Sequence, residues 1–262
     1  MKIALLLVLS ACGSAAVPDP ATRPTSFSVE VHHRGAGNPV ILIPGLGCPP
    51  SIWDATVAHL ADREVHVIAF AGFAGRPPID APLGATAHDE LAAYIARLDH
   101  PIVIGHSMGG WLAYWLAVTD PAALGGLVTI DGNASLGAPA SPRAVRDQWA
   151  GTSDEALRAV YGSMVADRSH IAPYLDAIAR SDRATMADVV VEQSKTDLRP
   201  RLAGIRVRTL AILSSTATPE VRDAIARVPH HRIVDVPRAK HFVMLDEPIA
   251  FHAALDAFLS DV

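Results

Sequence analysis

Residues 101–118 read PIVIGHSMGGWLAYWLAV and contain the pattern that decides the fold. The apolar residues before the pentapeptide GHSMG (105–109) predict a buried strand, and the apolar run after it predicts a helix. The pentapeptide matches G-x-S-x-G, which places a serine on a tight strand-to-helix turn with its Oγ exposed. Its two outer glycines leave room where strand and helix nearly touch. Ser107 is therefore the candidate nucleophile, and an incidental serine in a glycine-rich turn is the alternative.

Short apolar runs alternate with helical patterns on both sides of this turn. This alternation predicts a mostly parallel α/β sheet with helices on both faces. Thr86 and Asp89 have the spacing of a capping box, which predicts a helix beginning near Thr86. The predicted strands are 27–33, 39–43, 64–70, 101–105, 123–131, 209–213 and 232–236, and the predicted helices are 52–61, 86–99, 108–118, 219–228 and 248–259.

One segment interrupts the alternation. Between Asp131 and Arg208 the sequence contains helical patterns and no good strand. A helical insertion in an α/β sheet predicts a cap over the carboxyl ends of the strands, where ligands bind in such sheets. The predicted organisation is a core made of residues 27–134 and 201–262, with a helical cap at 135–200 inserted before the last two strands.

Composition and charge exclude several classes of protein. Of the 262 residues, 50% are apolar and 19% are charged, so a sizeable core is expected and disorder is not. The net charge is -5 and no basic stripe occurs, which argues against nucleic-acid binding. No metal-ligand spacing, dinucleotide-binding glycine motif or P-loop is present, so neither a metal nor a cofactor is expected.

The N-terminus is typical of a targeting segment. MKIALLLVLSAC has one lysine and an apolar run too short to span a bilayer. Its last four residues, LSAC, resemble a bacterial lipoprotein signal, which implies cleavage before Cys12 and lipidation of that cysteine. An ordinary signal peptide cut after Ala15 or Ala16 is the alternative. The lipoprotein interpretation predicts a signal peptide at 1–11, a tether at 12–26 and a lipid-anchored protein of the bacterial cell envelope, in the periplasm or at the cell surface.

Cys48 is the second of the two cysteines. No motif places a histidine beside it, so we expect a small apolar filler rather than a nucleophile. If Cys12 carries a lipid, Cys48 has no partner for a disulfide.

Over about residues 27–260 the chain resembles the α/β-hydrolases of the serine esterase and lipase type. IPGLGCPPSIW at 43–53 is similar to the oxyanion loop of that family. The resemblance implies that the backbone amides of Leu46 and Met108 hold the oxyanion. The family more often has His-Gly where this chain has Pro44 and a glycine, but backbone donors do not depend on that side chain.

AKHFVMLDEP at 239–248 resembles the histidine loop of the family, with Lys240 in place of its usual glycine. The resemblance makes His241 the candidate general base. The loop SSTATP after the strand 209–213, where the acid often lies, contains no carboxylate. Asp131 ends the preceding strand and fits the chain order Ser, acid, His. It is the candidate acid, Glu220 is the alternative, and Asp131 as a simple turn residue is a third interpretation.

The predicted function is hydrolysis of carboxylic esters with small to medium, mainly apolar acyl or aryl groups, through an acyl-enzyme on Ser107. Lactones, thioesters and C–C bonds are chemically close alternatives. A second hypothesis is an inactive binding or scaffold lipoprotein on the same fold, which the missing carboxylate in SSTATP favours. The predicted pocket wall consists of Phe70, Phe73, Trp111, Trp149, Tyr161 and Met164.

Overall fold

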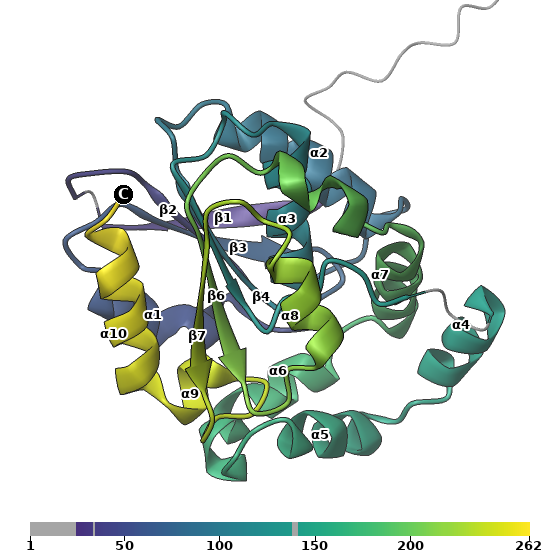
Figure 1. The fold of residues 1–262 in the computed structure, drawn as a ribbon. Coiled ribbons are helices and arrows are strands. Elements are labelled where there is room, and N and C mark those ends of the chain that lie inside the picture. Colours follow the sequence, from purple (N-terminus) through teal and green to yellow (C-terminus); the bar gives the residue numbers. More distant parts are fainter. Residues whose placement is uncertain (1–24, 34, 138–140) are drawn as a thin grey trace, which may run out of the picture.

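A computed structural model describes residues 25–33, 35–137 and 141–262, and its centre is a seven-stranded sheet in the order β1-β3-β2-β4-β5-β6-β7 (Figure 1). Strand β1 is antiparallel to β3, and every other neighbouring pair is parallel. The predicted mostly parallel sheet is confirmed, with the predicted first strand at its edge. The strands are β1 (Phe27–His32), β2 (Val40–Ile43), β3 (Val65–Phe70), β4 (Ile102–His106), β5 (Gly126–Ile130), β6 (Thr209–Ser214) and β7 (His231–Val236).

Cys12 and the predicted signal peptide lie outside the described residues, as does the predicted tether up to residue 24.

Helices cover both faces of the sheet, as Figure 1 shows: α1 and α10 lie on one side, and α2, α3 and α8 lie on the other. Within the described residues, no helix combines the length and apolar character needed to cross a bilayer. The core helices are α1 (Asp54–His59), α2 (Leu83–Ile95), α3 (Met108–Thr119), α8 (Pro219–Ile225), α9 (Val243–Asp246) and α10 (Pro248–Leu259). The 3-10 turn η2 (Pro50–Trp53) comes directly before α1.

In the part of the segment between β5 and β6 that the structure describes, the regular elements are all helical. Its helices α5 and α6 lie beyond the arrowheads of β6 and β7 in Figure 1, and α7 lies beside α2. We call residues 141–204 the cap. Its elements are α4 (Pro142–Ala150), α5 (Asp154–Ser163), η3 (Arg168–His170), η4 (Ala172–Tyr174), α6 (Leu175–Ala179), α7 (Arg183–Lys195) and η5 (Arg199–Gly204).

Helix α2 begins at Leu83, so Thr86 lies inside its first turn rather than before it, and the predicted capping box is wrong. The free amides at this helix start are satisfied from the cap. The carboxylate of Glu192 in α7 accepts the N–H groups of Gly84 and Ala85 at 2.8 and 3.0 Å. Because the first amides of a helix have no partner within it, this distant carboxylate does the work of a local cap.

The register of the central strands brings three chain segments to one edge of the sheet. His106 at the end of β4 pairs with Ile130 in β5, and Ile130 pairs with Ile212 in β6. The ladder continues one step further, because the amide of Ser107 donates to Ile130 and that of Asp131 donates to Ile212. Residues that follow β4, β5 and β6 are therefore neighbours at the carboxyl edge.

Candidate active site

Ser107 occupies the turn between β4 and α3 with φ 55° and ψ -114°, a strained backbone conformation for a residue with a side chain. Its side chain does not cap the helix, so the Oγ is free for another role. A Cβ on Gly105 would lie 2.1 Å from the carbonyl oxygen of Gly109, and a Cβ on Gly109 would lie 2.2 Å from that of Ile43. Only glycine fits at either position, as the sequence pattern predicts.

Asp131 follows β5 directly and has φ 45°. Its side chain is 5% exposed, and Ser214 binds the carboxylate twice: the backbone N–H donates to Oδ1 at 2.8 Å and the Oγ donates to Oδ2 at 2.6 Å. Burial pushes the pKa of Asp131 upward, but the hydrogen bonds from His241 and Ser214 outweigh burial, so the pKa lies below its ordinary value. The carboxylate is therefore ionised at neutral pH.

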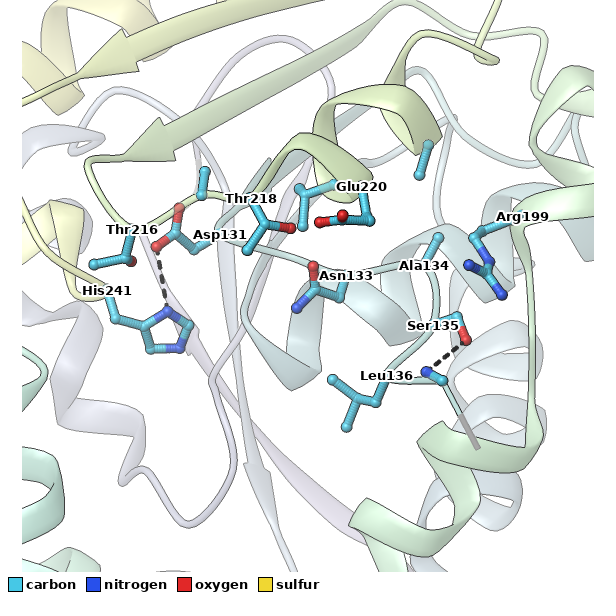
Figure 2. Close-up of a pocket in the computed structure, with 14 residues that line it drawn as sticks. Asp131, Asn133, Ala134, Ser135, Leu136, Arg199, Thr216, Thr218, Glu220 and His241 are labelled. Carbon is cyan, nitrogen blue, oxygen red and sulfur yellow. Dashed lines mark hydrogen bonds and ion pairs between the residues drawn. The ribbon is translucent and has the colours of Figure 1, made fainter. Parts of the chain in front are cut away.

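His241 lies in the loop between β7 and α9, and its Nδ1 is 3.2 Å from Oδ2 of Asp131 (Figure 2). The imidazole is 28% exposed, so one edge of the ring remains accessible. Because an ionised carboxylate can only accept, Nδ1 carries the proton and Nε2 is left as the basic nitrogen. The structure thus brings together Asp131 and His241 as the sequence analysis expects, and Ser107 lies at the same edge of the sheet.

His106, the residue before the serine, holds the backbone of the histidine loop. Its Nε2 donates to the carbonyl oxygen of His241 at 3.0 Å. Burial, with the nearby His241 ring, lowers the pKa of His106 to about 3, so this imidazole stays neutral. No sequence pattern indicates a role for His106, because its partner is a main-chain atom.

The loop after β2 forms a tight turn beside Ser107. The amide of Cys48 donates to the carbonyl of Gly45 at 3.1 Å, and Gly47 has φ 67°. A Cβ on Gly45 would lie 3.4 Å from Cβ of Ser107, which places this turn against the serine. In the described part of the chain the amide of Leu46 donates to no protein group, and Met108 is the first residue of α3, where amides are normally free.

The chain matches a known protein family over most of its length. The sequence model described as "Alpha/beta hydrolase family" matches residues 40–254, which is most of the chain. This chain belongs to the alpha/beta hydrolase family.

Several relatives of this alpha/beta hydrolase carry esterase names. It is 24% identical to the pimeloyl-[acyl-carrier protein] methyl ester esterase of Aeromonas hydrophila, over 89% of this chain and 100% of that one. The protein of the same name from Shewanella woodyi is 32% identical over 40% of each chain. Among solved structures, the fold is similar to an enol-lactonase from Burkholderia xenovorans (TM-score 0.77, 22% identity, 89% and 96% covered) and an esterase from Exiguobacterium antarcticum (TM-score 0.80, 15% identity, 89% and 95% covered).

Two carboxylates that the sequence analysis considered have different surroundings in this alpha/beta hydrolase. Glu220 lies past the loop after β6, and no hydrogen bond joins it to His241 within the described ranges. Hydrogen bonds from Thr218 and the backbone lower the pKa of Glu220. Asp131 is thus the carboxylate that contacts His241, and the loop SSTATP supplies hydroxyl and amide donors to it instead of a carboxylate.

Asp246 joins the cap to the histidine loop, a role that sequence analysis missed. Its side chain is fully buried and accepts the amides of Ala166 at 2.9 Å and Lys240 at 2.9 Å. It also accepts a hydrogen bond from Nδ1 of His170, with 2.8 Å between the nitrogen and Oδ1. A carboxylate five residues after a histidine has no motif to mark it, so only the folded chain identifies these partners.

A cavity of about 380 Å³ opens beside the Asp131–His241 pair of this alpha/beta hydrolase. Figure 2 shows these two residues at one end and Arg199 at the other. Besides Asp131 and His241, its polar lining residues are Asn133, Ser135, Thr216, Thr218, Arg199 and Glu220.

None of the six residues predicted to form an apolar pocket wall lines this cavity. Phe70, Phe73 and Trp111 are at most 1% exposed and belong to the hydrophobic core, because they sit on a central strand, the following turn and the elbow helix. Trp149 and Met164 are partly buried against the core, and Tyr161 is 5% exposed.

Cys48 and the possible metal ligands of the described residues are the other chemically reactive groups to consider. Cys48 is buried and free, and burial raises the pKa of its thiol to about 12, so it is a poor nucleophile at neutral pH. Across the ranges that the structure describes, no group of three or more His, Cys, Asp or Glu side chains could hold a metal ion.

Proposed function

We propose that this alpha/beta hydrolase is a serine carboxylic-ester hydrolase in which Ser107 is the nucleophile, His241 the general base and Asp131 the acid. The observation that carries the proposal is the contact between the buried Asp131 carboxylate and Nδ1 of His241 at 3.2 Å. Such a carboxylate fixes the tautomer of the imidazole and stabilises the imidazolium that forms during the reaction. A turn residue without a catalytic role would need neither this contact nor the two bonds from Ser214.

In the proposed reaction, Ser107 Oγ attacks the ester carbonyl while Nε2 of His241 takes its proton. The C=O bond becomes a C–O⁻ bond, and the amides of Leu46 and Met108 donate hydrogen bonds to that oxyanion. His241 then gives the proton to the departing alkoxide, which leaves an acyl-enzyme on Ser107. Water attacks the acyl group with His241 again acting as base, and the acid and the free serine are released.

The names of the relatives and the cavity limit the choice of substrate. The relatives named above are esterases and a lactonase, which supports an ester or cyclic ester. The cavity next to His241 offers hydroxyl, amide and charged groups beside short apolar ones. This lining favours an ester of modest size in which the mainly apolar acyl or aryl part that the sequence predicts carries a polar group that enters the cavity.

Labelling with a fluorophosphonate tests the proposed function directly. An activated serine displaces fluoride from phosphorus, so we expect a single covalent adduct on the peptide that contains Ser107. Heat-unfolded protein is the control and should not react, because labelling requires the folded site. A folded protein that leaves Ser107 unmodified would favour the inactive binding or scaffold alternative.

We also propose that the mature protein is anchored to the bacterial envelope through a lipid on Cys12. The support is the stretch LSAC before a linker rich in small residues and proline. Replacing Cys12 by serine is expected to leave an uncleaved precursor or to release the protein from the membrane fraction. Mass spectrometry of the wild type provides the check, and an unmodified N-terminus after Ala15 or Ala16 would instead indicate an ordinary signal peptide.

A further inference from the structure

Side chains from the cap contact the turn that holds the Leu46 amide. The hydroxyl of Tyr161 in α5 lies 2.5 Å from the carbonyl oxygen of Leu46, and Ser181 Oγ lies 3.0 Å from that of Gly47. Met186 in α7 packs on the same turn, since a Cβ on Gly47 would lie 2.8 Å from its Cε. The cap therefore contacts the residues beside the serine directly, over a sequence distance of more than a hundred residues.

Tyr161 is the donor in its hydrogen bond. A carbonyl oxygen can only accept, and burial raises the pKa of Tyr161 well above its usual range, so the phenol keeps its proton. The side chain is 5% exposed, and its ring lies 6.1 Å from that of Phe242, the residue after His241. Packing therefore fixes the ring, and water cannot easily replace the hydroxyl.

Three successive peptide groups of the turn are each held by one hydrogen bond. The Gly45 carbonyl is bound by the Cys48 amide, the Leu46 carbonyl by Tyr161 and the Gly47 carbonyl by Ser181. In a trans peptide the C=O and N–H bonds point in opposite directions. The Gly45 carbonyl points into the turn, so the Leu46 amide points out of it.

Glycine makes this arrangement easy to lose. Gly47 has φ 67° and flanks the Leu46 peptide, and a glycine rotates between conformations more freely than any other residue. Without the bond from Tyr161, the Leu46–Gly47 peptide group could turn, and the adjoining Gly45–Leu46 peptide, which carries the Leu46 N–H, would be held only by the bond from the Cys48 amide. The bonds from the cap remove that freedom before substrate arrives, which is what preorganised donors require.

We propose that Tyr161 is a positioning residue that keeps the Leu46 amide directed at the oxyanion, so that the cap is a structural part of the oxyanion hole. Ser181 supports the same turn one peptide further on. This inference rests on the proposed function, since the Leu46 amide matters to catalysis only if Ser107 forms a tetrahedral intermediate.

The test is Tyr161→Phe, which removes one oxygen and keeps the ring. With a p-nitrophenyl ester we expect kcat to fall about 10- to 100-fold with little change in KM, because a misdirected donor weakens the transition state and not substrate binding. A trifluoromethyl ketone forms a hemiketal with the serine whose oxygen occupies the oxyanion hole. Its Ki should rise by about the same factor as kcat/KM falls, a result that a purely structural role would not produce.

Tyr174→Phe is the matched control, because Tyr174 is a partly buried cap tyrosine whose hydroxyl makes no contact with this turn in the described structure. It should leave kcat, KM and Ki unchanged. Ser181→Ala is the second variant and should lower kcat in the same direction, with less than additive loss in combination with Tyr161→Phe. A rise in KM at constant kcat would mean that Tyr161 contacts substrate, and unchanged kinetics would overturn the proposal.

Hydrogen exchange separates a failure of this inference from a failure of the proposed function. Tyr161→Phe should speed amide exchange in a peptide covering 44–53 and leave a peptide from β4 unchanged, whether or not the protein is active. Faster exchange in Tyr161→Phe, combined with a wild-type protein that fluorophosphonate does not label, would retain the positioning role of Tyr161 and reject the esterase. Unchanged exchange in Tyr161→Phe would reject the positioning role of Tyr161 alone.

Discussion

Ser107→Ala is expected to lower kcat for p-nitrophenyl ester hydrolysis by about 10⁶-fold, the loss found when a triad nucleophile is removed. The serine side chain does not cap α3, so the substitution takes away only an oxygen that the fold does not use. The melting temperature should therefore stay close to that of the wild type. Steady-state kinetics and thermal unfolding on the same preparation provide the measurement.

Ser260→Ala is the matched control, since Ser260 is exposed at the end of α10 and its hydroxyl donates to the carbonyl of Ala257 in the same helix. It should keep full activity. If Ser107→Ala retains more than about a hundredth of the wild-type rate, another group performs the attack and the assignment of the nucleophile is wrong.

Asp131→Asn is expected to lower turnover by up to about 10⁴-fold, by analogy with the same change in a serine protease. The structure gives the reason. The Ser214 amide donates to Oδ1, so an asparagine would direct its oxygen there and its NH₂ group towards His241. That NH₂ group would donate to Nδ1, move the ring proton to Nε2 and leave the base unable to accept a proton from Ser107.

Glu220→Gln is the control for this prediction and should change turnover little, because Glu220 makes no bond to His241 within the described residues. A pH–rate profile on both variants would confirm that the histidine is affected in one and not in the other. Near-normal turnover in Asp131→Asn together with a large loss in Glu220→Gln would reverse the assignment of the acid.

Much of the fold was predictable because the residues that define the central turn and the buried strands are adjacent in the sequence and are the same residues that pack in the core. The elbow around Ser107 combines an apolar strand, a glycine-flanked serine and an apolar helix, and all three occur where expected. The buried central strands read as continuous apolar runs, as strands covered on both faces do. Since carboxyl ends of parallel strands share one edge, the proximity of Asp131 to the histidine loop also follows from the sequence.

The remainder depends on tertiary contacts that leave no local pattern. The start of α2 is set by Glu192 from the cap, so a local capping rule chose the wrong residue. The stretch SSTATP lacks a carboxylate, which in the sequence alone favours an inactive site. In the folded protein its first residue, Ser214, donates a hydrogen bond to the carboxylate of Asp131 at the end of the adjacent strand. Proximity to a motif predicts a pocket wall for large aromatic residues such as Trp111, whereas the fold buries them in the core.

The buried carboxylate of Asp246 has a consequence for how such enzymes diversify. Recombination could exchange the cap for that of a relative as if it were a separate module. A foreign cap that lacks the imidazole of His170, or that places no backbone amide where Ala166 does, would leave the buried Asp246 side chain with fewer hydrogen bonds. The stretch 239–248 would have to be inherited together with the cap, so the heritable unit includes the loop that bears His241 and is larger than the helical insertion.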